Sequence, residues 1–107
     1  MVEYPVILAA DADMIIRFWV ERFSIVRYAV VLRHIDLNTG NARTVRVFDN
    51  SHGEEQPLGG HHMHRYSPDG DKEPPEIFHH GTPAEALAEA RRMVQEGFDA
   101  MIEQWRR

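Results

Sequence analysis

The stretch "TPAEALAEARRMVQEGFDAMIEQW", residues 82–105, decides the fold because it is the clearest helix in the sequence. Thr82, Pro83 and Glu85 match a capping box with proline at the first helical position. Apolar side chains then recur at steps of three and four residues, as on one face of an amphipathic helix. They are Leu87, Ala90, Val94, Phe98, Met101 and Trp105. A helix with such a face needs a second layer of structure that buries it.

The second layer is predicted in the segments that precede this helix. From Phe23 to Arg33, apolar and polar residues alternate with a period of two, which is typical of a half-buried strand. "LNTGN", residues 37–41, predicts a hairpin loop in which Gly40 takes the left-handed conformation. "ARTVRVFD", residues 42–49, is the expected return strand. This loop predicts three facing pairs: Leu37 with Asn41, Val31 with Val47, and Val30 with Phe48.

The other segments are shorter or harder to interpret. "YPVIL", residues 4–8, is typical of an edge strand because Pro5 has no N–H to donate, and residues 11–22 fit either a strand or one helical turn. Residues 50–60 predict a loop, "HHMHRYS" a short strand and "PDGD" a turn. "PPEIFHH" predicts another edge strand. Phe18, Trp19 and Trp105 are expected in the core or at its border.

These elements predict an α+β fold: a small antiparallel sheet of three to five strands, with a long C-terminal amphipathic helix packed on one face. The length of 107 residues indicates one domain, 1–107.

Composition excludes some classes of function. The formal net charge of −5 argues against broad, nonspecific coating of nucleic acid. All but one of the twelve basic residues are arginine, so a local anion site stays open. The absence of cysteine excludes disulfides and cysteine-ligated metals. We expect no membrane partner and a cytoplasmic location, because no long apolar run exists and "MVEYPVILAAD" is not typical of a secretory signal.

The candidate site lies in "GGHHMHRYS", residues 59–67, which holds three of the seven histidines within four positions. Residues two apart on a strand share a face, so His62 and His64 are expected to project together. Asp49 and His52, at the end of the preceding strand, could converge with them. Arg65 falls on the opposite face, with His61 and Met63, if the strand is regular.

Three interpretations of this cluster stay open. His62 and His64 could chelate a divalent metal, with a third ligand from Asp49 or His52. The same histidines could act as a general base and a general acid, with Asp49 orienting one ring and Arg65 binding developing negative charge. Alternatively, the cluster could be a wet sheet edge without a site. His79 and His80 precede the helix and are expected to have a packing role.

The order of a hairpin, "RVFDNSHG", "HHMHR" and a terminal amphipathic helix resembles the TumE-type toxins of bacterial and archaeal toxin–antitoxin modules. It is also similar to related uncharacterised small domains with an Asp…His-Gly…His-x-His signature. The resemblance covers residues 24–106 and marks six positions: Asp49, His52, Gly53, His62, His64 and Arg65. "EEQPLGG" makes the spacing between Gly53 and His61 longer than in that signature.

The resemblance implies a toxin that a cognate antitoxin, commonly a DNA-binding one, neutralises. An activity on RNA or nucleotides, by cleavage or nucleotidyl transfer, is inferred from the His/Asp/Arg group. The alternative is a non-catalytic module that binds a metal or a protein partner. A homo-oligomer stays open in either case.

Overall fold

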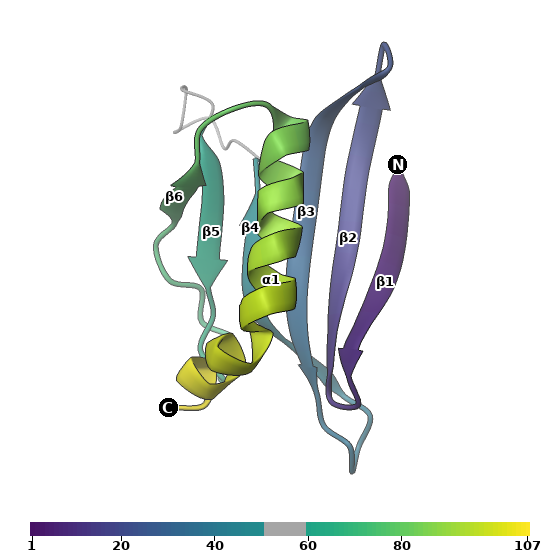
Figure 1. Cartoon of the computed structure of the whole chain (residues 1–107). Helices are drawn as coiled ribbons and strands as arrows, with labels where there is room; N and C mark the ends of the chain where they lie inside the picture. Colours follow the sequence, from purple (N-terminus) through teal and green to yellow (C-terminus); the bar gives the residue numbers. More distant parts are fainter. Residues whose placement is uncertain (51–59) are drawn as a thin grey trace.

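The computed structural model describes residues 1–50 and 60–107, which form one six-stranded antiparallel sheet and one helix. The strands follow the chain order across the sheet, so each pairs with the next (Figure 1). They are β1 (Val2–Ala9), β2 (Ala12–Glu21), β3 (Ser24–Ile35), β4 (Ala42–Asp49), β5 (His61–Arg65) and β6 (Glu76–His79). The helix α1 (Pro83–Arg106) lies across one face, mainly over β3 and β4 (Figure 1).

The expectation of an α+β fold with the helix on one face is confirmed, but the expected number of three to five strands is wrong. The sheet has six strands because both N-terminal segments form strands. In β2, Ala12, Met14 and Ile16 are fully buried at every second position, which excludes a helical turn there. The strand β1, with Pro5 in it, lies at the edge of the sheet as predicted.

The predicted pairs of Val31 with Val47 and Val30 with Phe48 are confirmed. The predicted pair of Leu37 with Asn41 is wrong, because the loop brings Asp36 opposite Asn41 through a backbone hydrogen bond of 2.9 Å. This offset by one residue is cancelled within β4, where Val45 forms a bulge between the partners of Leu32 and Arg33.

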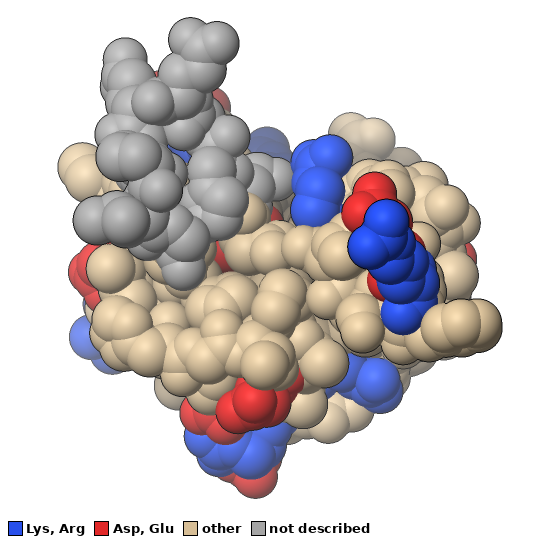
Figure 2. Space-filling view, turned by 90° about the horizontal axis from the view of Figure 1, so that it is seen from above, with Lys and Arg blue, Asp and Glu red and all other residues tan. Residues whose placement is uncertain are grey.

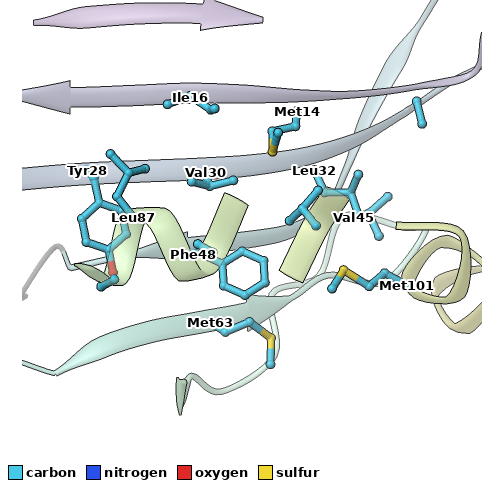
Figure 3. Close-up of a cluster of buried hydrophobic side chains, with 14 of the residues drawn as sticks. Met14, Ile16, Tyr28, Val30, Leu32, Val45, Phe48, Met63, Leu87 and Met101 are labelled. Carbon is cyan, nitrogen blue, oxygen red and sulfur yellow. The ribbon is translucent and has the colours of Figure 1, made fainter. Parts of the chain in front are cut away.

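The core lies between α1 and the inward face of β2 to β5 (Figure 3). Tyr28, Val30, Leu32 and Phe48 are each at most 1% exposed and contribute its centre. The helix contributes six buried residues: Ala86, Leu87, Ala90, Val94, Met101 and Ile102. Phe98 and Trp105, which the periodicity places on the same face, pack against the core but are only partly buried.

The helix begins as the sequence predicts. Thr82 is the N-cap, and its hydroxyl accepts a hydrogen bond of 3.1 Å from the backbone N–H of Glu85. Among residues 1–50 and 60–107, no helix is long and apolar enough to cross a membrane.

Candidate functional site

The strand β5 divides its side chains between the two faces of the sheet. Met63 pairs with Phe48 and joins the core, so Met63 lies on the face that α1 covers. His62 and His64 lie on the other face, which we call the open face. Asp49 is the register partner of His62, so its side chain lies on the open face as well.

Three of the predicted site residues therefore come together on the open face. The Nε2 atom of His64 lies 3.9 Å from Oδ1 of Asp49. The ring of His62 lies beside that of His64, with 6.4 Å between their centroids. The side chains of His64 and Asp49 are 12% and 17% exposed, so the pair is shielded but not sealed.

The environment of His64 favours a neutral imidazole. Burial lowers the pKa of His64 below its ordinary value of 6.5, and the positive charge of Lys72 acts in the same direction. The Asp49 carboxylate opposes this shift, but its effect is smaller. At neutral pH His64 is therefore unprotonated and able to accept a proton.

A hollow of about 530 Å³ lies on the open face, and Asp49 of this pair lines it, whereas neither His62 nor His64 does. Its floor includes Ile15, Ala29, Val31 and Val47, and Asp49 and Tyr66 also line it. Trp19 and Arg17 line the hollow from β2. The guanidinium of Arg27 lies 4.7 Å above the centre of the Trp19 ring, within the range of a cation–π contact.

The position of Trp19 differs from the expectation of a core residue. It lies on the open face because β2 buries its even-numbered residues, and Trp19 alternates with them. The polar side chain of Arg17, two positions earlier on the same face, was the sequence signal for this orientation.

The charges on the open face are largely paired. Arg33 donates two hydrogen bonds to the carboxylate of Asp13, at 2.8 and 2.6 Å. Arg17 pairs with Glu3 on the edge strand. Seen from above, the molecule also shows charged side chains of both signs close together, with uncharged surface between them (Figure 2).

The structure does not bring Arg65 to the histidines. Arg65 pairs with Arg46 in the register of β4 and β5, on the face that α1 covers, and it forms an ion pair with Glu76. A single His/Asp/Arg cluster is therefore not formed, because β5 is regular between His62 and Arg65 and no bulge turns Arg65 over. His52 and Gly53, the other predicted site positions, lie outside the described residues.

His61 has a structural position. The Tyr28 hydroxyl lies 2.9 Å from its Nδ1, and its Nε2 lies 2.8 Å from the Gly81 carbonyl oxygen. Burial raises the pKa of Tyr28, so its hydroxyl is a donor at neutral pH, and Nε2–H of His61 then donates to Gly81. His79 packs near His61, with 5.9 Å between ring centroids, while His80 is exposed.

Metal ligation finds no support in residues 1–50 and 60–107, where no group of three or more His, Asp or Glu side chains could hold an ion. His62 and His64 do share a face, but the described residues supply no third ligand in a suitable position.

Comparisons with protein-family models, with curated proteins and with solved structures found no match to this chain. Inferences about function therefore depend on the geometry of the chain itself.

Proposed function

We propose that this chain is a toxin-like enzyme that acts on RNA or a nucleotide, with Asp49, His62 and His64 as its catalytic residues. The observation that carries the proposal is the Asp49–His64 pair, 3.9 Å apart, beside a hollow on the open face. A shielded histidine with a lowered pKa and a carboxylate neighbour is a common arrangement for a general base.

In this proposal His64 accepts the proton of an attacking hydroxyl group, and Asp49 stabilises the imidazolium that results. The hydroxyl oxygen forms a bond to phosphorus while the bond to the leaving oxygen breaks. His62, whose ring centroid lies 6.4 Å from that of His64, is proposed to return a proton to that leaving oxygen from its protonated form. Phosphodiester cleavage or nucleotidyl transfer both follow this scheme, and Arg65 has no part in it.

The substrate is expected to be a nucleotide or a short single strand rather than a duplex. Trp19 and the guanidinium of Arg27 offer a surface on which a base could stack. Arg17 and Arg33 are already paired with carboxylates, so the face has little free positive charge for a long phosphate backbone. The net charge of −5 also favours a nucleotide or a short single strand over a duplex as the substrate.

A second candidate is a non-catalytic module that binds a protein partner on the open face. The apolar floor of Ile15, Val31 and Val47 favours it, because a partly exposed apolar surface with a polar border suits a protein contact. The resemblance to TumE-type toxins implies a cognate antitoxin, and the two candidates are compatible if that antitoxin covers this face.

The test compares the wild-type chain with His64→Ala and Asp49→Asn, and uses His80→Ala as the control because His80 is an exposed histidine outside the cluster. Expression of the wild-type chain in a bacterial host is expected to slow growth, and both site variants should relieve this effect at equal soluble expression. The purified wild-type protein should turn over a short single-stranded RNA, and His64→Ala should lose about a hundredfold or more of that rate.

Turnover that is equal in wild-type and His64→Ala protein would exclude His64 as a catalytic residue. Binding of a protein partner without any RNA turnover, lost on Val31→Asp, would support the second candidate instead.

A further inference from the structure

A second hollow lies on the face that α1 covers, between the C-terminal part of the helix and the end of β5 at Arg65. We call it the arginine groove. It has a volume of about 410 Å³ and includes Arg46, Arg65 and Arg107 among its lining residues. Among the described residues that line it, Glu73 alone has a side-chain carboxylate, and Glu76, outside the lining, pairs with Arg65.

The two arginines of the sheet lie directly opposite each other. Arg46 in β4 and Arg65 in β5 are register partners, an arrangement in which like charges repel. Arg46 is only 7% exposed, and both burial and the charge of Arg65 lower its pKa. The neighbouring acceptors contact only the terminal nitrogens of the two guanidinium groups. Gln104 Oε1 accepts from Nη2 of Arg46 at 2.9 Å, and Glu76 pairs with Nη1 of Arg65.

Three hydrogen-bond donors of this groove have no acceptor. Among the described residues, Nε of Arg46, Nε of Arg65 and Nε1 of Trp105 are buried and make no hydrogen bond. All three nitrogens belong to residues that line the groove, and all three can only donate. Unsatisfied buried donors are rare in folded proteins, and three of them in residues around one hollow favour an acceptor there.

We propose that the arginine groove binds the phosphate group of a small phosphate ester, such as a nucleoside monophosphate. Two facing guanidinium groups match a dianion, whose oxygens can accept several hydrogen bonds at once. Trp105 and Met101 supply an apolar wall beside the arginines, which suits a planar ring attached to the phosphate. The volume lies in the range of pockets that hold small organic ligands.

This proposal is independent of the catalytic role proposed for the open face. The arginine groove lies on the opposite side of the sheet from His62 and His64, since Arg65 and His64 are neighbours in a regular strand. Failure of one proposal therefore leaves the other unaffected.

The test is calorimetric titration of the full chain with adenosine monophosphate and, separately, with inorganic phosphate. Saturable binding of both is expected, with the nucleotide tighter. Arg65→Gln should weaken nucleotide binding about tenfold or more, because it removes a charge-assisted hydrogen bond. Trp105→Phe keeps an aromatic ring but removes the N–H donor, so it should weaken binding by a smaller factor.

Arg92→Gln is the matched control, since it removes the same charge from the solvent-exposed side of α1, where Arg92 pairs with Glu89 and Glu96. It should leave binding unchanged. Circular dichroism of each variant establishes that the fold is retained. Absence of saturable binding by the wild-type chain, or equal binding by wild-type and Arg65→Gln protein, would overturn the proposal. Nucleotide binding that survives Arg65→Gln but is lost in His64→Ala would assign the nucleotide to the open face and overturn it as well.

Discussion

Neighbouring histidines have different roles in this protein because the strand places them on different faces. His61 is 4% exposed and connects Tyr28 to Gly81 through its two ring nitrogens. His64, three positions later, lies on the open face beside Asp49. His61 connects the sheet to the segment that leads into α1, and His64 has the environment of a proton acceptor.

At the residue scale we predict that His64 makes stability depend on pH. Burial lowers its pKa in the folded state, so below the ordinary value of 6.5 the unfolded chain binds more protons than the folded one. The free energy of unfolding contributed by His64 is therefore full above that pH and decreases as the pH falls towards the lowered pKa. His64→Gln should reduce the loss of stability between about pH 7.5 and about pH 5.5, measured by urea unfolding.

His80→Gln is the control for this experiment, because His80 is exposed and its substitution should leave the pH dependence unchanged. The prediction is wrong if the wild-type chain and His64→Gln lose the same stability over this range.

Among the elements, the β2–β3 hairpin contains backbone strain. Glu21 pairs with Ser24, so the loop consists of Arg22 and Phe23 alone. Their φ angles are +47° and +68°, as a type I′ turn requires, although neither residue is glycine or asparagine. The side chain of Phe23 is fully exposed, so its contacts do not offset the strain.

At the element scale we predict that replacing Arg22 and Phe23 with Asn and Gly stabilises the protein. Each non-glycine residue in the left-handed region costs about 1 kcal/mol, of which the greater flexibility of glycine in the unfolded chain cancels a part. The free energy of unfolding should rise by about 1 kcal/mol in urea titrations.

Phe23→Ala serves as the comparison, because alanine keeps the Cβ atom and hence the strain while it removes the same exposed ring. It should change stability by less than about 0.5 kcal/mol. An Asn–Gly loop no more stable than Phe23→Ala would show that the hairpin is not strained.

Residues 1–50 and 60–107 form two layers, one sheet and one helix, and α1 covers one face of the sheet (Figure 1). One hollow lies on the open face, and the arginine groove lies beside α1. The core between the layers is continuous from β2 to β5 and along the helix. We therefore expect residues 1–107 to unfold as one domain.

At the scale of the whole molecule we predict that Phe48→Ala lowers the stability of the sheet and of the helix in a single transition. Phe48 is fully buried between the sheet and α1, so its truncation should cost about 3–5 kcal/mol. Trp19 on the open face and Trp105 near the end of α1 are the two tryptophans of the chain. Their fluorescence, followed one at a time in Trp19→Phe and Trp105→Phe backgrounds, should report the same shifted transition as far-ultraviolet circular dichroism.

Ile77→Ala is the control, since Ile77 is 56% exposed on the edge strand and should contribute much less. Transitions of the two tryptophans that separate in Phe48→Ala would show that the chain does not unfold as one unit.

Local patterns in the sequence were sufficient to predict much of this fold. The capping box at Thr82 and the steps of three and four residues predicted α1, because helix periodicity depends only on neighbours along the chain. Alternation predicted that His62 and His64 share a face and that Arg65 does not, which the register of β5 confirms. The pairing of Val30 with Phe48 was also predicted, although the loop that leads to it was not.

Only the tertiary structure decided which residues from distant parts of the sequence come together. The bulge at Val45 that restores the β3–β4 register depends on packing across the sheet, and the six-strand sheet depends on β1 and β2 finding partners. Trp19 lies beside Arg27 and lines the hollow of the open face because β2 and β3 pair in this register. Arg46 and Arg65 face each other near Trp105, although the three residues belong to two strands and the end of the helix. They are far apart in the sequence, so no local sequence pattern predicts that they line the same groove.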